Sequence, residues 1–205
     1  SAFNTFSPFP TSIWSITVPS LIRLTVRSDC SISIVCIYDS INGSKMNGFF
    51  QKDVISIRDL GKKDLDSIFS ATEKIISLDP NQRREIARGK TLGYLFFEPS
   101  TRTRLSFQSA MALIGGTSLG IADVSSSSVQ KGESLSDTVR VMSGYTDVLV
   151  LRHPLDGSSR FSAEISQKPI INGGSGTEEH PTQAIQDLFT IKREKKKIDG
   201  LKIGI

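Results

Sequence analysis

The sequence has no long apolar run, little cysteine and only a small net charge, and each shortage excludes a class of protein. No stretch approaches the roughly 20 consecutive apolar residues that a membrane-spanning helix requires, so a membrane protein is not expected. The two cysteines, Cys30 and Cys36, are too few for a disulfide framework or a zinc site. The net charge of +4 at pH 7 is too small to indicate a nucleic-acid partner.

The composition of the 205 residues is that of an ordinary globular protein, with 38% hydrophobic and 22% charged residues. This length provides one domain with a full hydrophobic core and part of a second domain. A break in character lies near Met46. Residues 1–45 hold both cysteines, the only tryptophan and ten serines but no glutamate, whereas amphipathic, charge-bearing sequence begins soon after Met46.

Three interpretations of residues 1–45 remain open. The segment can lie upstream of the true start and have no evolved structure. It can be a transit peptide, because a Ser-rich, acid-poor composition is typical of organelle targeting, although it has only two arginines, Arg23 and Arg27. It can also form an extra strand or hairpin. Because the sequence from Met46 onward contains no cysteine, we expect a cytoplasmic protein, or an organellar one if residues 1–45 are a transit peptide.

Hydrophobic periodicity after Met46 predicts helices that alternate with short strands. In the helix predicted over 134–145, one side carries Leu135, Thr138, Met142 and Tyr145. Gly115-Gly116 supplies a left-handed stop after the helix that precedes it. The predicted helices cover about residues 59–78, 107–114, 134–145, 158–166 and 183–193, and the predicted strands cover 91–97, 117–123, 147–152, 169–172 and 200–205.

Strands alternating with helices imply right-handed βαβ crossovers, so the expected fold class is α/β, with a parallel sheet flanked by helices. The first domain is expected over residues 46–196. A charged hinge follows, and residues 197–205 are expected to start the first strand of a second α/β domain. In such sheets ligands bind beyond the carboxyl ends of the strands, so the site is expected there.

The most informative strand end is Phe96-Phe-Glu-Pro-Ser-Thr-Arg-Thr-Arg104. A strand, a hydroxyl-rich turn and a helix N-terminus together bind phosphate, because free backbone N–H groups point outward and the helix dipole adds about half a positive charge. Ser100, Thr101 and Thr103 add hydroxyl donors, and Arg102 adds a planar charged fork. The alternative is that Ser100 or Thr101 is only an N-cap and the arginines are solvated. A run of consecutive anion donors after a buried strand favours the anion site.

Residues 97–104 resemble the carbamoyl-phosphate signature of the aspartate/ornithine carbamoyltransferases, in the form with Pro99 that is typical of the aspartate enzymes. Three further segments are similar to motifs of this family and follow in the expected order: Ser127-Ser-Val-Gln-Lys-Gly-Glu133, Leu151-Arg-His-Pro154 and His180-Pro-Thr-Gln183. The resemblance extends from about Phe50 to Ile205. It implies that the first domain is a Rossmann-like carbamoyl-phosphate-binding domain.

The resemblance also implies a role for each matched residue. The phosphate would be held by Ser100, Thr101, Arg102 and Thr103. Arg152 would bridge the phosphate and carbonyl oxygens. His180 would donate to the carbonyl oxygen as negative charge builds there, a contact worth about 3 kcal/mol in other enzymes. The Gln183 amide, on the same helix face as His180, would bond the carbamoyl nitrogen.

In this family the loop that matches Ser127 and Lys131 completes the site of an adjacent subunit, which implies a homotrimer of catalytic chains, alone or with regulatory chains. Lys131 would stabilise phosphate as it leaves; without the resemblance it would be interpreted as a solvated charge. His153 is interpreted as a neighbour of Arg152 that shapes the turn.

The implied reaction is attack by the α-amino group of L-aspartate on carbamoyl phosphate, which gives N-carbamoyl-L-aspartate and phosphate in an early step of pyrimidine synthesis. Positioning and electrostatics would provide catalysis without a metal or cofactor. Asn172-Gly-Gly-Ser-Gly176 replaces the usual Asn-Ala-Gly-Asp-Gly, so a carboxylate that could order this loop is missing. The residues that would bind the aspartate carboxylates are expected beyond Ile205. The chain is therefore expected to bind carbamoyl phosphate weakly and not to turn over aspartate.

Three other functions are less consistent with the sequence than transfer of a carbamoyl group to aspartate. Ornithine carbamoyltransferase is the nearest and is disfavoured by Pro99 and Thr182. A non-catalytic phosphate-binding module would predict loss of the motif arginine or histidine, and both are present. A dinucleotide-binding domain is disfavoured because Gly174-Ser-Gly176-Thr-Glu-Glu179 lacks the third glycine. The basic run Lys192–Lys197 is interpreted as the exposed end of a helix, where cations suit the dipole, not as a nucleic-acid site.

Overall fold

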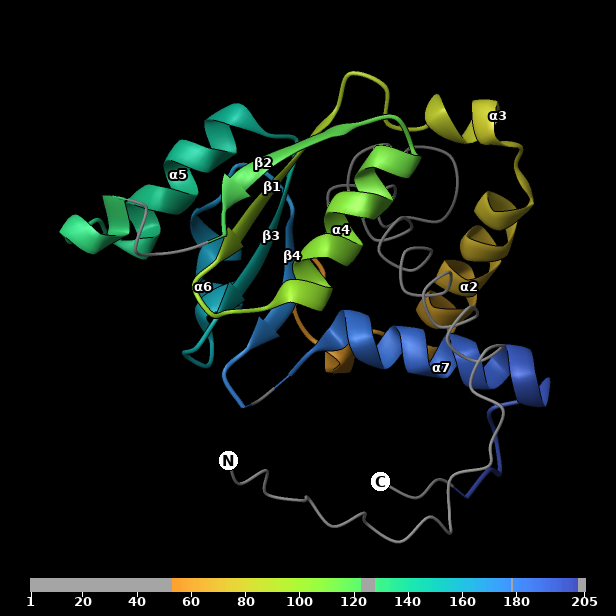
Figure 1. The fold of residues 1–205 in the computed structure, drawn as a ribbon. Helices are drawn as coiled ribbons and strands as arrows, with labels where there is room; N and C mark the ends of the chain where they lie inside the picture. Colours follow the sequence, from red (N-terminus) through yellow and green to blue (C-terminus); the bar gives the residue numbers. More distant parts are fainter. Residues whose placement is uncertain (1–52, 123–127, 178, 203–205) are drawn as a thin grey trace, which may run out of the picture.

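The computed structural model describes residues 53–122, 128–177 and 179–202 and shows an α/β architecture (Figure 1). Four strands form one parallel sheet in the order β2-β1-β3-β4. Their bounds are β1 Thr91–Phe96, β2 Thr117–Ile121, β3 Val148–His153 and β4 Ile170–Ser175. The expected fold class is therefore confirmed. Residues 1–45, Ser127 and residues 203–205 lie outside the described residues, and Gly200, Leu201 and Lys202 are not in the strand that was expected to begin there.

Helices cover both faces of the sheet (Figure 1). One face carries α2 (Lys62–Ser77), α4 (Thr101–Leu113) and α7 (Pro181–Lys195), and the other carries α5 (Leu135–Tyr145) and α6 (Ser158–Ile165). The shorter helices are α3 (Pro80–Arg84), η1 (Ile57–Asp59) and η3 (Ser128–Lys131). Within the described part of the chain, no helix is both long enough and apolar enough to cross a membrane.

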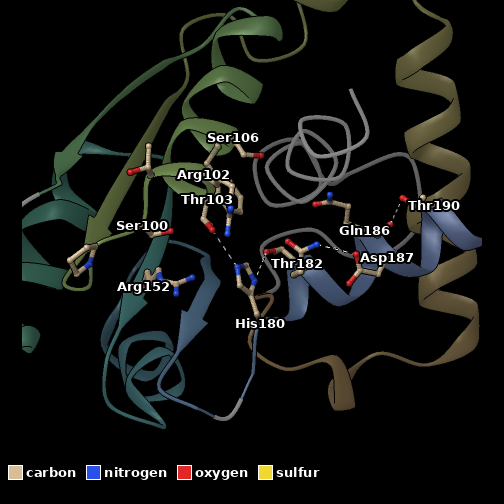
Figure 2. A pocket seen from close by; sticks show the side chains of 14 residues that line it. Ser100, Arg102, Thr103, Ser106, Arg152, His180, Thr182, Gln186, Asp187 and Thr190 are labelled. Carbon is tan, nitrogen blue, oxygen red and sulfur yellow. Dashed lines mark hydrogen bonds between the residues drawn. The ribbon is translucent and has the colours of Figure 1, made fainter. Parts of the chain in front are cut away.

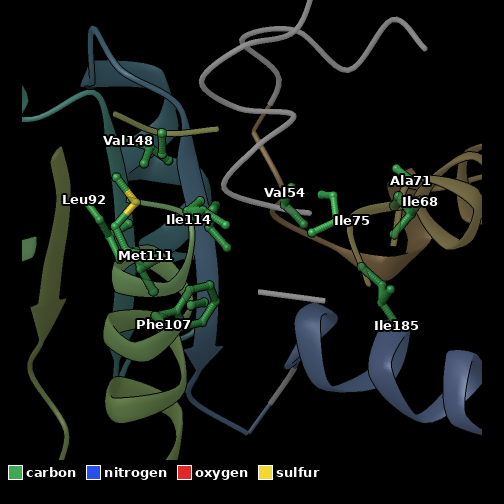
Figure 3. Close-up of a cluster of buried hydrophobic side chains, with 14 of the residues drawn as sticks. Val54, Ile68, Ala71, Ile75, Leu92, Phe107, Met111, Ile114, Val148 and Ile185 are labelled. Carbon is green, nitrogen blue, oxygen red and sulfur yellow. The ribbon is translucent and has the colours of Figure 1, made fainter. Parts of the chain in front are cut away.

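The strands divide their side chains between two cores, because successive residues of a strand point to opposite faces. In β3, Val148 and Val150 pack with α2, α4 and α7, whereas Leu149 and Leu151 belong to the cluster that includes Val139 of α5. Figure 3 shows the larger core, where the buried face of α4 meets the sheet. Helices on both faces explain why β3, whose first four residues are all buried, is a continuous apolar run in the sequence.

The order of the strands reverses between β1 and β3, and this reversal positions the site. β2 lies on one side of β1, and β4 lies beyond β3 on the other side. The connection after β1 enters α4 on one face, and the connection after β3 enters α6 on the opposite face, so the two diverge and leave a crevice at the carboxyl ends. The Phe97 N–H donates to the Arg152 carbonyl oxygen (2.8 Å), which keeps the two strand ends paired up to that point.

Helix α4 ends in the left-handed stop that the sequence predicts. Gly115 has a φ of +88°. Its N–H donates to the Ala112 carbonyl oxygen (3.2 Å), and the Gly116 N–H donates to the Met111 carbonyl oxygen (3.0 Å). These two bonds make up a Schellman motif, so the prediction is confirmed.

Some boundaries and contacts differ from those predicted. The helix expected from residue 59 begins at Lys62, after the 3-10 turn η1. The short helix α3 was not predicted; the Asp79 carboxylate starts it by accepting hydrogen bonds from two backbone N–H groups. Placing Tyr145 on the apolar side of its helix is wrong, because Tyr145 is 68% exposed. Thr138 and Met142 of the predicted side are buried, and Val139 and Ser143 complete the buried side of α5.

Candidate functional site

A cavity of about 990 Å³ opens where the carboxyl ends of β1 and β3 meet the first turns of α4 and α7 (Figure 2). Its lining includes Ser100, Thr101, Arg102, Thr103, Arg152, His180 and Gln183. These residues come from three segments that are far apart in the sequence. Among the residues that the structure describes, every predicted site residue except Lys131 is therefore brought together at this cavity.

The turn into α4 has the geometry of an anion site. Ser100 is the N-cap residue, with extended backbone angles (φ −153°, ψ 97°), and its side chain makes no capping hydrogen bond. Ser100 occupies the N-cap position, but its hydroxyl is not used for capping and can donate to a ligand. The first N–H groups of a helix have no acceptor inside the helix, and Ser100, Thr101 and Thr103 line the cavity, so these N–H groups and the Ser100 hydroxyl are available to an anion there. Thr101 and Arg102 are exposed, and Thr103 is half-buried.

Arg152 reaches the cavity from the end of β3 and is held on two sides. Its Nη2 donates to the Glu98 carboxylate (3.0 Å) and its Nη1 to the Gly173 carbonyl oxygen (3.2 Å). Its Nε is buried and has no hydrogen-bond partner among the described residues. Gly174 lets the backbone approach this closely, because a Cβ atom there would lie 2.8 Å from the Arg152 Nη1. The Arg152 side chain keeps 21% of its surface exposed, and the Nη N–H groups that make no internal hydrogen bond can donate to an oxygen of a ligand in the cavity.

His180 stands at the N-cap of α7 and points between two threonines (Figure 2). Its Nε2 lies 3.5 Å from the Thr103 Oγ1, and its Nδ1 lies 3.3 Å from the Thr182 Oγ1. Burial, and secondarily the nearby charge of Arg152, lowers the pKa of His180 to about 4. The imidazole is therefore neutral at pH 7, with one N–H to donate. A neutral donor suits a carbonyl oxygen that gains negative charge.

The first three turns of α7 contribute residues to which the sequence patterns gave no role in the site. Thr182, Gln186, Asp187 and Thr190 also line the cavity. The Gln183 Nε2 donates to the Asp187 Oδ1 (3.0 Å), one helical turn further along. A possible sequence signal for Asp187 is its spacing of four from Gln183, which places both on one helix face. That spacing alone is too common to indicate a site.

The end of β4 is held in place without the carboxylate that is missing from its motif. The Asn172 side chain donates to the Ile55 carbonyl oxygen (2.9 Å) and to the Ser175 hydroxyl (3.2 Å), and its Oδ1 accepts from the Gly174 N–H (2.9 Å). Glu179 then fixes the approach to His180. Its carboxylate accepts the Ser56 hydroxyl (2.7 Å) and a backbone N–H of η1 (2.9 Å).

The remaining predicted residues lie elsewhere. Lys131 is exposed at the end of η3 and does not line the cavity of its own chain. Ser127 lies outside the described residues. His153 accepts the Leu155 N–H at its Nδ1 (3.1 Å), and the same nitrogen lies 2.9 Å from the Ser158 hydroxyl. These contacts are those expected of a residue that shapes the turn.

The described residues contain no group of three or more His, Cys, Asp or Glu side chains that could hold a metal ion. The donors that surround the cavity are instead hydroxyl groups, guanidinium groups, an imidazole and backbone N–H groups. This set of donors suits an anionic ligand with a polar carbonyl group.

The family model of the aspartate/ornithine carbamoyltransferase carbamoyl-P binding domain matches residues 52–193. The chain belongs to the aspartate/ornithine carbamoyltransferase family. Within this family it is similar to the aspartate carbamoyltransferase catalytic subunits of Nitrosopumilus maritimus (74% identity over 160 residues) and Thermococcus gammatolerans (52% over 155 residues). These alignments cover 78% and 75% of this chain, and 52% and 50% of the relatives. The chain thus spans about half the length of the curated relatives it matches.

Two solved members of the carbamoyltransferase family are similar in structure as well. The catalytic subunit of M. jannaschii aspartate transcarbamoylase is 49% identical, with a TM-score of 0.68 over 73% of this chain and 49% of that chain. Aspartate transcarbamoylase from Trypanosoma cruzi, in complex with carbamoyl phosphate and aspartate, is 36% identical, with a TM-score of 0.69 over 74% of this chain and 50% of that chain.

Proposed function

We propose that the cavity binds carbamoyl phosphate and that the whole protein transfers its carbamoyl group to the α-amine of L-aspartate. The convergence of Arg152 and His180 on the turn Ser100–Thr103 is the observation that carries the proposal. A phosphate dianion fits the N-terminus of α4, where backbone N–H groups and hydroxyl groups donate to it. The carbamoyl carbonyl oxygen then faces the two groups that come from β3 and α7.

In the proposed reaction the aspartate nitrogen forms a bond to the carbamoyl carbon, and the bond from that carbon to the phosphate oxygen breaks. Phosphate leaves with the electron pair, and the amine gives up a proton that the leaving phosphate can accept. Negative charge builds on the carbonyl oxygen in between. His180, neutral and already placed, donates to this oxygen, and Arg152 stabilises both this oxygen and the phosphate. Gln183 bonds the carbamoyl nitrogen.

Aspartate rather than ornithine is supported as the acceptor by the names of the similar proteins, which are aspartate carbamoyltransferase catalytic subunits. Pro99 and Thr182 agree with the aspartate-type motifs. Incubating the whole protein with carbamoyl phosphate and each amino acid separately would test this. Formation of N-carbamoyl-L-aspartate is expected, and exclusive formation of citrulline from ornithine would contradict it.

Binding of the first substrate is testable on the 205-residue chain. Phosphonoacetamide, a stable analogue in which a methylene group replaces the ester oxygen, should bind in a titration calorimeter and compete with inorganic phosphate. Arg152→Ala should weaken its binding about 10- to 100-fold, because a charge-assisted contact is lost and Glu98 is left unpaired. Arg140→Ala removes an exposed arginine from α5, outside the cavity, and serves as the matched control. A folded wild-type chain that binds neither phosphonoacetamide nor phosphate would refute the proposal.

We further propose that the site is completed in a homotrimer by the loop of a neighbouring copy. The support is the position of Lys131, whose exposed side chain does not line the cavity of its own chain. A lysine that acts on the leaving phosphate must therefore come from a second copy. Sedimentation equilibrium of the whole protein measures the number of copies, and a strictly monomeric active protein would contradict this proposal.

A further inference from the structure

The side chains of Gln183 and Asp187 form a hydrogen bond on the face of α7 that lines the cavity. The Gln183 Nε2 is 3.0 Å from the Asp187 Oδ1, and both residues line the cavity. Figure 2 shows the Asp187 carboxylate pointing back along the helix toward this bond. An exposed pair of side chains one turn apart on a helix usually does no more than stabilise that helix. Because this pair lines the cavity, its hydrogen bond also affects how Gln183 can contact a ligand.

A carboxylate beside a glutamine side chain favours one of the two orientations of the glutamine amide. The side-chain amide of glutamine has an oxygen end that accepts and a nitrogen end that donates, and the two ends have nearly the same shape. An ionised carboxylate can only accept hydrogen bonds. Asp187 therefore selects the orientation in which Gln183 directs its NH₂ group along the helix. The Gln183 Oε1 is left as the end of the amide that Asp187 does not engage.

An acceptor at that position distinguishes two kinds of acyl phosphate. The carbamoyl group carries an NH₂ with two N–H donors, whereas an acetyl group of almost the same size carries a methyl group with none. An amide oxygen facing this position accepts a hydrogen bond from the carbamoyl NH₂, whereas an acetyl group offers it no donor. An NH₂ facing it would repel the carbamoyl NH₂. The orientation of one amide thus decides which group the site prefers.

We propose that Asp187 is a positioning residue: it fixes the Gln183 amide with its oxygen toward the acyl group of the substrate, and so makes the site selective for a carbamoyl over an acetyl phosphate. This inference rests on the proposed function, because it assumes that the acyl group lies next to Gln183. Asp187 does not touch the substrate itself. Its effect passes through the Gln183 amide.

The test compares two ligands of equal charge. Phosphonoacetamide carries the amide NH₂, and acetonylphosphonate carries a methyl group in its place. The ratio of their dissociation constants, measured by calorimetry on the same chain, cancels changes in phosphate attraction and in overall stability. For the wild-type chain the amide should bind about 5- to 10-fold more tightly, the worth of one hydrogen bond to a neutral partner.

Three variants separate the proposed role from a structural one. Asp187→Asn keeps the shape but lets the Gln183 amide adopt both orientations, so the preference should fall by about twofold. Asp187→Lys donates to the Gln183 oxygen and turns its NH₂ toward the ligand, so the preference should be lost or reversed. Glu194→Gln removes a negative charge from an exposed position of the same helix, away from the cavity, and should leave the ratio unchanged. In a Gln183→Ala background, the two Asp187 variants should have no further effect on the ratio.

The outcomes are distinguishable. A ratio that is the same in wild type, Asp187→Asn and Asp187→Lys overturns the inference, and so does a wild-type chain that binds both ligands equally; the proposed function survives either result. A wild-type chain that binds neither ligand refutes the proposed function itself. Circular dichroism checks folding, and if Asp187→Lys does not fold, the near-isosteric Asp187→Asn carries the test.

Discussion

His180 shows how its surroundings can give one residue a defined chemical state. Burial disfavours a charged imidazole, and the neighbouring Arg152 guanidinium disfavours it further, so both causes lower its pKa to about 4. A protonated imidazole would add a second cation beside the arginine. The neutral ring instead supplies a single N–H between Thr103 and Thr182, and the hydroxyl partners hold the ring in place. The same burial that positions the donor therefore keeps it uncharged.

This lowered pKa predicts a pH-dependent stability. The pKa is near 6.5 in the unfolded chain and about 4 in the folded one, so between these values the unfolded state binds more protons. The contribution is fully present above pH 6.5 and is lost as the pH falls toward 4. Between pH 7.5 and pH 5 we expect His180 to account for a loss of about 2 kcal/mol in the free energy of unfolding.

Urea denaturation of wild type and His180→Gln at both pH values measures this contribution. All other titratable groups are the same in both proteins, so the difference between their losses of unfolding free energy isolates the contribution of His180. The variant should lose less stability on acidification. Equal losses in the two proteins would show that His180 is not buried as described.

Helix α4 joins the site to the core, since its first turn faces the cavity and its later turns are packed in the interior. Phe107 and Met111 are buried against the sheet, while Ser100 precedes the helix at the cavity. The Schellman motif at Gly115 fixes where the helix ends. Because a helix is stiff, fixing its end and its buried face also fixes the direction of its N-terminal N–H groups.

Replacement of Gly115 should therefore be severe. A Cβ atom there would lie 1.7 Å from the Arg84 carbonyl oxygen, and the φ of +88° is unfavourable for any other residue. We expect Gly115→Ala to lower the free energy of unfolding by about 3 kcal/mol or more.

Gly144→Ala is the matched control for this change. Gly144 lies inside α5, and an added Cβ atom meets nothing within 4 Å. This substitution should raise the free energy of unfolding by about 0.5–1 kcal/mol. Urea midpoints of the two variants should move in opposite directions, and a small effect of Gly115→Ala would contradict the close approach to Arg84.

In the assembled protein, the proposed site draws on two copies of the chain, which predicts complementation between two inactive variants. Lys131→Ala and Arg152→Ala should each reduce the carbamoyltransferase activity of the whole protein at least about tenfold, the worth of one charge-assisted contact. After the two variants are dissociated and reassembled together, some sites combine an intact Lys131 from one copy with an intact Arg152 from another, so activity should return.

Lys63→Ala, an exposed lysine on α2, is the control and should leave activity unchanged. Mixed oligomers with no more activity than the parent variants would show that Lys131 does not act across copies.

Local patterns in the chain predicted the four strands of the sheet, the five longer helices and the chemistry of the first strand end, but not the short helix α3. The helix-to-strand alternation predicted the parallel sheet, because burial on both faces leaves continuous apolar runs. The residues Ser100–Thr103 indicated an anion site because hydroxyl groups and an arginine follow a strand directly. Tyr145 was placed wrongly, since spacing along one helix does not reveal which side the sheet covers.

Contacts between distant segments were decided only by the folded chain. The strand order β2-β1-β3-β4 brings Arg152 and His180 to the same crevice, and no local pattern contains that order. The pairing of Arg152 with Glu98 and the lowered pKa of His180 depend on burial by residues far away in the sequence. Electrostatic effects of this kind act through space, over a few ångströms, and so they exist only once the sheet has placed these groups side by side.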